Sequence, residues 1–430
     1  MPPSSAWKRP VALFLTSQTL SLFGSSLVQY ALLWFVTLET QSATAITLYT
    51  LCGFLPTFLL APFGGVWADR HDRKRLIILA DGLIALATLA LALAFLAGAR
   101  SLPLVLFAAA LRALGTAVQA PAVGALLPSL APPDELTRVN GLSASIQGGI
   151  MLLAPMAAGA LMTLWPIEVL FFVDVVTAAL AIAVLGLYVR VPAAAAPAPA
   201  RPGTYLEDMR LGFRYLREHP TLTTFFTYVA VLLFLLAPAA FLTPLQVART
   251  FGDEVWRLTA IEIAFSVGML LGGALVAAWA GPRNRIRVMA GAALTMGVCT
   301  VLLGLMPTFA LYLAPMALFG LALPFYNTGA TVLLQEQVDP RFLGRVFSLF
   351  TMLMTSMMPL GMLVFGPLAE AVDIAWLLLG TGAVILALVA LLLSDARLVA
   401  SGAPRPGGFA DPDAPASDAP AAPSSAPPAP

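Results

Sequence analysis

Three charged residues lie inside stretches of the chain that are otherwise almost entirely apolar: Arg112, Asp174 and Glu262. A charge at mid-bilayer costs roughly 2.5 to 3.5 kcal/mol on insertion scales, so such residues usually face a cavity or a partner. Burial favours the protonated form of a carboxyl group, which a proton-coupling site requires. We therefore predict proton coupling for the three residues. The alternatives are a structural ion pair for Arg112 and simple access to interfacial water for the two carboxyl groups.

The sequence gives little support for enzymatic hydrolysis, metal binding or direct use of ATP. Both histidines, His71 and His219, fall outside the apolar stretches, and the two cysteines, Cys52 and Cys299, fall inside them. An intramembrane hydrolase would need a nucleophile with a base, or a metal cluster. The chain has no Gly-x-x-x-x-Gly-Lys-Ser/Thr run, so direct use of ATP is unsupported. We expect no enzyme, no cofactor and no metal site.

The composition is that of a polytopic membrane protein. Of the 430 residues, 60% are hydrophobic and 10% are charged, and the mean hydropathy is +0.90. Soluble domains carry about a quarter charged residues. The net charge of +1, with basic residues at the ends of apolar stretches, excludes nucleic acid as an expected partner.

Apolar stretches long enough to cross a bilayer predict an all-α membrane protein with 12 transmembrane helices in two six-helix pseudo-repeats. The predicted helices cover residues 10–38, 43–66, 76–98, 102–127, 141–164, 168–190, 221–247, 257–280, 286–306, 309–335, 344–370 and 374–394. The corresponding domains are a first bundle (1–190), a cytoplasmic linker with an amphipathic helix (191–220), a second bundle (221–397) and a disordered cytoplasmic tail (398–430).

The basic residues predict the orientation. With twelve helices, nineteen of the 23 Lys and Arg residues fall on the side of the two termini. Three fall on the other side, Arg100, Arg249 and Arg257, and Arg112 lies within a helix. Because short loops rich in Lys and Arg stay cytoplasmic, both termini are predicted to be cytoplasmic.

An internal repeat relates the two halves. The segment 127–139 can be laid on 334–346 with a constant offset and five identities in thirteen positions. Six helices per half keep the two copies in the same orientation, as in transporters whose halves rock about a central site.

The loop Gly65 to Arg75 contains the most informative motif. It resembles the signature of the major facilitator superfamily between helices two and three, Gly-x-x-x-Asp-Arg-x-x-Arg-Lys/Arg. The matching residues are Gly65, Asp69, Arg70, Arg73 and Lys74. Asp72 replaces a frequent Gly, and in the second half the corresponding loop, 272–287, lacks the acidic residue. Asp81, one turn into the next helix, is expected to pair with the nearby cations.

Further segments are similar to the drug:proton antiporter branch that includes macrolide-efflux type exporters. They are 111–117 with Pro121, 139–142 with Gln147, 334–336 with 344–348, and 358–362 with 366–368. The antiporter motif of helix five, however, survives only as Ala154-Pro155 with Gly159. The resemblance therefore implies transport more firmly than antiport.

The resemblance implies how the residues would work. Asp69 and Arg73 would latch helix ends in one state, Gly65 would allow close helix approach, and Arg112 is similar to a helix-four Arg associated with proton coupling. The substrate cavity would lie between helices one, four, seven and ten, whose polar and aromatic residues are Gln18, Gln29, Tyr30, Gln119, Phe241, Gln246, Phe325, Tyr326 and Asn327. Such residues suit an amphipathic organic ligand.

The sequence thus predicts a monomeric secondary transporter in a bacterial inner (plasma) membrane that exports amphipathic small molecules, of a drug-like or macrolide-like kind, in exchange for protons. Its partners would be the small-molecule substrate, protons and the lipid bilayer. Two alternatives stay open: export of a natural metabolite such as a siderophore, and a membrane sensor that does not transport.

Overall fold

The computed structural model describes residues 7–189, 205–278 and 284–403, without the side chains of residues 61, 62, 69 and 205–208. All regular elements in these ranges are helical. They are α1 (Lys8–Thr40), α2 (Ala43–Arg70), α3 (Arg73–Leu96), α4 (Leu102–Leu130), η1 (Pro133–Glu135), α5 (Leu136–Leu164), α6 (Ile167–Ala183), η2 (Val184–Tyr188), α7 (Tyr205–Glu218), α8 (Pro220–Phe241), α9 (Thr243–Thr250), α10 (Val255–Ala278), α11 (Arg285–Leu305), α12 (Phe309–Gln337), α13 (Leu343–Ala371), α14 (Ile374–Ser394) and α15 (Ala396–Ser401).

Within the described residues, twelve helical segments are long and apolar enough to cross a membrane, which confirms the predicted fold class. Three of them are composite. The fifth begins with the short turn η1 and continues as α5. The sixth runs from α6 into the π-helical turn η2, and the seventh runs from α8 into α9. The protein is therefore a multi-pass membrane protein.

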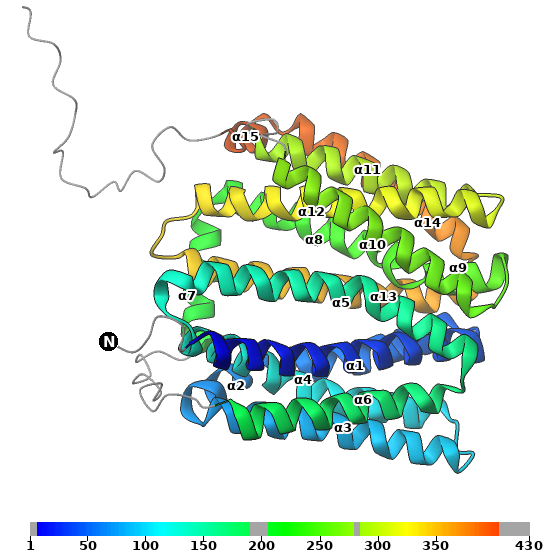
Figure 1. The fold of residues 1–430 in the computed structure, drawn as a ribbon. Coiled ribbons are helices and arrows are strands. Elements are labelled where there is room, and N and C mark those ends of the chain that lie inside the picture. The colour runs from blue at the N-terminus through cyan, green and yellow to red at the C-terminus, as the bar shows by residue number, and fades with distance from the viewer. Residues whose placement is uncertain (1–6, 190–204, 279–283, 404–430) are drawn as a thin grey trace, which may run out of the picture.

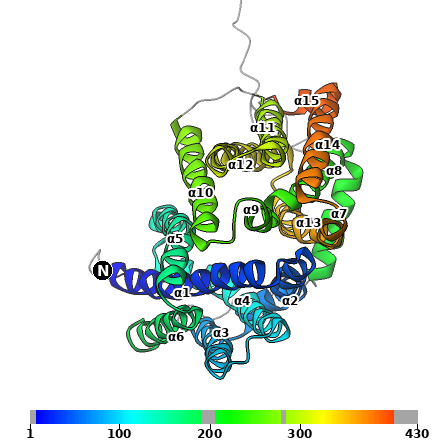
Figure 2. The same cartoon turned by 90° about the vertical axis from the view of Figure 1, so that its right-hand side faces the viewer.

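The twelve membrane-spanning segments fall into two groups that lie side by side (Figures 1 and 2). The first group is α1 to α6 and the second is α8 to α14. They touch mainly along two seams, α2 with α13 and α5 with α10, and α1 also contacts α9. Both ends of the described chain lie at one end of the bundle, which we call the termini end, and α9 lies at the opposite end (Figure 1).

Short polar side chains begin several of the helices by accepting a backbone N–H of the first turn, as N-cap residues do. Asp72 accepts the N–H of Arg75 at the start of α3, and Asn284 accepts the N–H of Arg287 at the start of α11. The Asp72 that departs from the superfamily signature is thus the cap of the third membrane helix. The third membrane helix of the second half, α11, begins with the same kind of side-chain cap, Asn284.

Glycines allow α10 and α12 to cross with their backbones in contact. A Cβ atom at Gly268 would collide with the carbonyl group of Ala317, and one at Gly320 would collide with the carbonyl group of Phe265. Small residues have this role in membrane helix packing, where dispersion contacts rather than the hydrophobic effect hold helices together.

We expect Gly268→Val to lower the free energy of unfolding by about 3 kcal/mol or more, because overpacking here meets backbone rather than a side chain that could move. The control is Gly273→Val on the same helix, where a Cβ atom meets nothing within 4 Å. The measurement is the Tm and the monodisperse yield of both variants in detergent. Equal behaviour of the two variants would contradict the close crossing.

The amphipathic segment of the linker forms α7, which packs on α13. Gly212 lies against Leu349, and the Tyr215 hydroxyl accepts the backbone N–H of Asp339 at 3.1 Å. The Ala- and Pro-rich break before α7, residues 191–204, lies outside the described residues.

The first residues of the predicted disordered tail are ordered. They belong to α15, where Leu398 is buried, and the carbonyl oxygen of Gly402 accepts the N–H of Arg285 at 2.7 Å. The remaining tail, residues 404–430, lies outside the described part of the chain.

Candidate functional site

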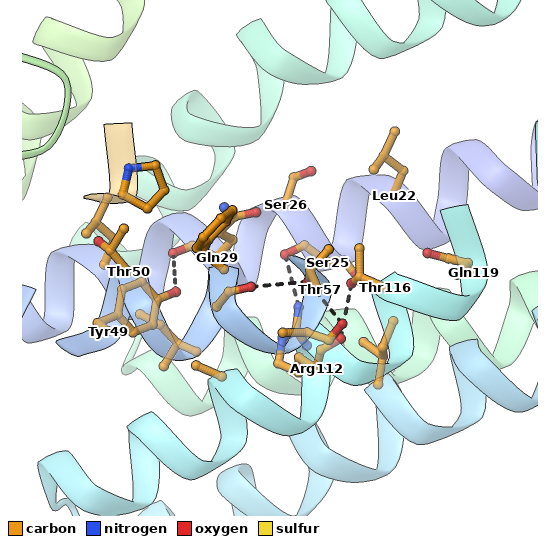
Figure 3. Close-up of a pocket in the computed structure, with 18 of the residues that line it drawn as sticks. Leu22, Ser25, Ser26, Gln29, Tyr49, Thr50, Thr57, Arg112, Thr116 and Gln119 are labelled. Atoms are coloured by element: carbon orange, nitrogen blue, oxygen red, sulfur yellow. Dashed lines mark hydrogen bonds between the residues drawn. The ribbon is translucent and has the colours of Figure 1, made fainter. Parts of the chain in front are cut away.

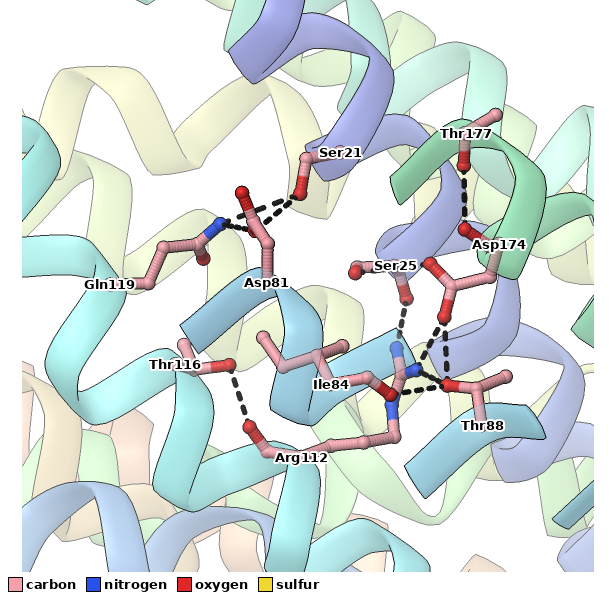
Figure 4. A network of polar contacts seen from close by, with 10 residues as sticks. All are labelled: Ser21, Ser25, Asp81, Ile84, Thr88, Arg112, Thr116, Gln119, Asp174 and Thr177. Atoms are coloured by element: carbon pink, nitrogen blue, oxygen red, sulfur yellow. Dashed lines mark hydrogen bonds and ion pairs between the residues drawn. The ribbon is translucent and has the colours of Figure 1, made fainter. Parts of the chain in front are cut away.

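A buried ion pair joins α4 to α6 in the first half (Figure 4). Arg112 Nη1 lies 2.6 Å from Asp174 Oδ2, and the Asp174 side chain is fully buried. Arg112 also donates to the Thr88 hydroxyl and, at 3.1 Å, to the carbonyl oxygen of Ser25. The Thr88 and Ser25 hydroxyls donate to the two oxygens of Asp174 at 2.8 and 3.2 Å. Every oxygen of this carboxylate therefore has a donor, and the network ties α1, α3, α4 and α6 together.

Helical periodicity places these side chains on facing sides of their helices. Asp81 and Thr88 are two turns apart on α3, as are Arg112 and Gln119 on α4. A close approach of α1 to α6 completes the arrangement, because Gly24 leaves room for the Thr177 hydroxyl and the backbone of Asp174. A side chain at Gly24 would separate the two helices at the depth of the ion pair.

Asp81 has a different environment from the one expected. Its Oδ1 accepts the Ser21 hydroxyl at 2.8 Å and the side-chain amide of Gln119, and the residue is 1% exposed. Its other oxygen, Oδ2, is buried and has no hydrogen-bond partner among the described residues. The expectation that Asp81 pairs with cations of the α2–α3 loop is wrong, because α3 turns its side chain inward toward α1 and α4 rather than toward the loop.

A cavity of about 390 Å³ lies beside these groups (Figure 3). Its wall is formed mainly by α1, α2 and α4, and Phe241 and Pro359 contribute from the second half. Hydroxyl and amide groups alternate with apolar side chains; the polar lining residues are Ser21, Ser25, Ser26, Gln29, Tyr49, Thr50, Thr57, Arg112, Thr116 and Gln119. The volume lies within the usual range of small-molecule sites.

At the end opposite the termini, a polar cluster joins the two halves. The Glu370 carboxylate on α13 accepts the Ser42 hydroxyl at 2.6 Å and the Thr44 N–H at 3.0 Å. Arg249 on α9 pairs with Glu370 at 3.4 Å and donates to the carbonyl oxygen of Gln41. We call these five residues the opposite-end latch. They hold the α1–α2 connection against α9 and α13.

Residues 14–362 match the model of the Major Facilitator Superfamily. The chain belongs to this superfamily. It is 30% identical to "Macrolide efflux protein A" of Streptococcus pyogenes over 395 residues, covering 91% of this chain and 97% of that protein. It is 32% identical to "Macrolide efflux protein A" of Enterococcus faecalis over 315 residues, covering 73% of this chain and 97% of that protein.

Solved superfamily structures have the same fold. A POT family transporter superposes with a TM-score of 0.72 at 11% identity, covering 91% of this chain and 96% of the other. At this identity the likeness concerns the fold alone.

The resemblance described in the sequence analysis predicts nine residues around the cavity. Three of them, Gln29, Gln119 and Phe241, line it. The other six lie away from its described wall. Gln246 instead donates to the carbonyl oxygen of Leu303 at 2.9 Å and accepts the Tyr312 hydroxyl at 2.8 Å. The remaining five, on α1 and α12, are Gln18, Tyr30, Phe325, Tyr326 and Asn327.

Glu262 lies apart from the Arg112 network. It is on α10 of the second half, close enough to Tyr30 on α1 for electrostatic interaction. The three membrane charges singled out in the sequence therefore form one ion pair, Arg112 with Asp174, and one separate group on α10.

In the superfamily signature loop, two cations bind backbone carbonyl groups. Arg73 donates to the carbonyl oxygens of Ala68 and Ala125 at 3.1 and 3.0 Å. Lys74 donates to those of Gly186 and Val189 at 2.8 Å each, at the end of η2. Cations are favourable at such helix C-termini.

The remaining signature residues are Gly65, Asp69 and Arg70. Arg70 is exposed, and the side chain of Asp69 lies outside the described part of the chain. A Cβ atom at Gly65 meets nothing within 4 Å, whereas one at Gly64 would collide with the carbonyl oxygen of Ala117. The close helix approach expected at Gly65 therefore occurs one residue earlier, between α2 and α4.

Sequence reasoning missed the hydroxyl groups of the site. A signal for some of them was present on α1, where Ser17, Ser21, Ser25 and Gln29 recur every fourth residue and so share one face of an apolar helix. The first of them, Ser17, donates to the carbonyl oxygen of Ala181, and the other three line the cavity. The contribution of α2, including Tyr49 and Thr57, had no comparable pattern.

Proposed function

We propose that this protein exports amphipathic small molecules, macrolide-like compounds among them, across a bacterial plasma membrane in exchange for protons. The observation that carries the proposal is the 30% identity with "Macrolide efflux protein A" over nearly the whole length of both proteins. The cavity supports it, because hydroxyl and amide groups set among apolar side chains suit a ligand with both kinds of surface. Gln29, Gln119 and Phe241 contact the substrate in this proposal.

Alternating access is the mechanism we propose for the transport cycle. The opposite-end latch closes one end of the interface between the halves, and the cavity beneath it is walled by both. With both termini in the cytoplasm, this arrangement corresponds to a state that opens inward. Breaking the latch and closing the signature loop through Asp69 would then open the cavity outward. The chain acts as a monomer, since each chain has both halves.

The membrane-embedded charges are the means by which a proton gradient would act on this cycle. Arg112 and Asp174 lie beside the cavity, and Glu262 lies near α1 across the interface between the halves. With Arg112 as a fixed positive charge, protonation of a carboxyl group in this region alters the charge that the membrane interior must accommodate, and so shifts the balance between two conformations. The six predicted cavity residues that lie elsewhere remain predictions for the substrate path.

The test is accumulation of a panel of macrolides and fluorescent amphipathic compounds in an efflux-deficient bacterium, with and without a protonophore. We expect the wild-type protein to lower accumulation several-fold, within the usual range of coupling between two sites. Asp69→Asn, Arg112→Ala and the protonophore should each abolish the effect. The matched control is Asp72→Asn in the same loop, because Asn is as good an N-cap as Asp and α3 should begin unchanged.

The possible results separate the alternatives. A wild-type protein that lowers accumulation regardless of the protonophore would contradict proton exchange while leaving export intact. A panel with no responding compound would favour a dedicated metabolite exporter or a sensor. Binding of a compound by the purified protein, without flux in proteoliposomes, would identify the sensor.

A further inference from the structure

Asp81 is a buried carboxyl group that neither the Arg112–Asp174 ion pair nor the signature loop uses. Two groups donate hydrogen bonds to this side chain, the Ser21 hydroxyl and the Gln119 amide, and both donate to Oδ1. Oδ2 is buried without a partner among the described residues. An ionised carboxylate in this position is unfavourable in free energy, because its buried oxygen loses the hydrogen bonds to water and no protein donor replaces them. A proton on Oδ2 removes that charge.

The charges around Asp81 differ from those around Asp174. The elements packed against α3 include α4 and α6, which carry the buried charges Arg112 and Asp174, and these pair with each other at 2.6 Å. Of the titratable groups on the described elements, Asp174 is the one that acts electrostatically on Asp81. Arg112 therefore compensates Asp174, and Asp81 has no cation of its own within the described site.

The two donors of Asp81 connect it to the cavity. Ser21 and Gln119 both line the cavity wall, and both donate to the Asp81 carboxyl group, which is not among the lining residues (Figure 4). A ligand in the cavity would touch the same side chains that hold the Asp81 carboxyl group. The group is thus one side chain away from the ligand and shielded from direct contact with it.

The charge balance of this region indicates which ligand would compete with a proton. Arg112, Asp174 and an ionised Asp81 sum to one negative charge, and protonation of Asp81 brings the sum to zero. A ligand with one positive charge compensates the same negative charge from the cavity side. Proton and ligand are then alternative occupants, which is the requirement for exchange.

We propose that Asp81 is the residue that binds the exchanged proton, on Oδ2, and that a cationic amphipathic molecule in the adjacent cavity displaces it. This rests on the proposed function for its transport cycle but not for the protonation of Asp81 itself. In the binding step the carboxylate takes up one proton and becomes a neutral acid; in the release step the O–H bond breaks and the carboxylate returns. Arg112 and Asp174 stay ionised in both steps.

The protonation is tested by infrared difference spectroscopy of the purified full-length protein in nanodiscs, between acidic and alkaline buffer. We expect a band of a protonated carboxyl group in the wild-type protein that is absent in Asp81→Asn and present in Glu262→Gln. Gln119→Leu removes a hydrogen bond to the same group and should shift the frequency of that band. This second variant decides the question if Asp81→Asn fails to fold. A band unchanged in both Asp81→Asn and Gln119→Leu overturns the proposal.

The coupling is tested in proteoliposomes with ethidium, a permanent monocation, as the probe. We expect Asp81→Asn to reduce uptake driven by a pH gradient by about tenfold or more, as for a typical coupling between sites. Ethidium exchange without a gradient should be weaker in the same variant, because the negative charge that the cation compensates is lost, but it should stay detectable, since Ser21 and Gln119 still line the cavity. Gradient-driven uptake that survives in Asp81→Asn overturns the proposal. A wild-type protein that does not move ethidium counts against the proposed export of cations, and the infrared band then decides the role of Asp81 alone.

Discussion

Arg112→Ala should abolish transport and lower the free energy of unfolding by about 3 to 5 kcal/mol, the usual effect of removing one partner of a buried ion pair. The reason is the position of Asp174, which is fully buried and would keep only the Thr88 and Ser25 hydroxyls as donors. The Arg112 side chain also links α4 to the backbone of α1. The measurements are Tm in detergent and transport of a compound that the wild-type protein exports.

A double variant separates stability from function at this pair. In Arg112→Met with Asp174→Asn, neither charge of the pair remains, so most of the lost stability should return. Transport should remain low, because the proposed coupling needs the fixed charges beside the cavity. Full recovery of transport would show that the ion pair is only structural, which is the alternative that the sequence left open for Arg112.

An exposed pair provides the control for these variants. Arg214 on α7 lies 3.9 Å from Glu218, and both side chains are more than 60% exposed. Arg214→Ala should change stability by no more than about 1 kcal/mol, as is usual for surface ion pairs. A loss as large as that of Arg112→Ala would mean that burial does not explain the effect.

The fold was predictable because a local sequence pattern marks each membrane helix. An apolar stretch of about 20 residues spans a bilayer whatever its neighbours are, and basic residues at its ends mark the connections. The break of the seventh span at Leu242 was less apparent, since Pro238 and Pro244 lie on both sides of it within a continuous apolar stretch. The span is therefore two helices, α8 and α9.

The site was harder to predict because it depends on how the helices are rotated about their axes. Arg112 and Asp174 were both recognised as unusual charges, but they are 62 residues apart and nothing local relates them. Gln246 was correctly predicted to lie in the seventh membrane span. Its side chain, however, accepts a hydrogen bond from Tyr312 within the second half. The predicted pairing of Asp81 with the loop cations rested on its distance from the basic loop along the sequence. That distance does not determine which neighbouring helices the side chain faces. Rotation is decided by the packing of all the helices, and glycines such as Gly24 contribute to it only in the folded protein.

Cross-linking the two halves at the closed end should stop transport completely and reversibly. On the α2–α13 seam, a Cβ atom at Gly366 would lie 2.9 Å from the Cβ atom of Thr47. On the α5–α10 seam, the corresponding distance from Gly159 to Thr259 is 2.8 Å. A disulfide needs about 3.5 to 4.5 Å between Cβ atoms, so each seam must widen by only a small amount to form one.

The cysteine pairs Thr47→Cys with Gly366→Cys, and Gly159→Cys with Thr259→Cys, are to be made in a background with Cys52→Ala and Cys299→Ala. Oxidation should abolish export in either pair and a reductant should restore it, because the outward-opening state requires these helices to separate. The control pair lies within one half, where a Cβ atom at Gly297 of α11 is 3.4 Å from that of Ile385 on α14.

Helices of one half move together in a rocking mechanism, so the disulfide between Gly297→Cys and Ile385→Cys should leave export unchanged. Inhibition by the control cross-link would indicate motion within the second half. Export that continues with both seams oxidised would contradict alternating access through this end of the bundle, and the opposite-end latch would then be a permanent contact. Inhibition at both seams but not in the control would assign the transport cycle to movement of one six-helix half against the other.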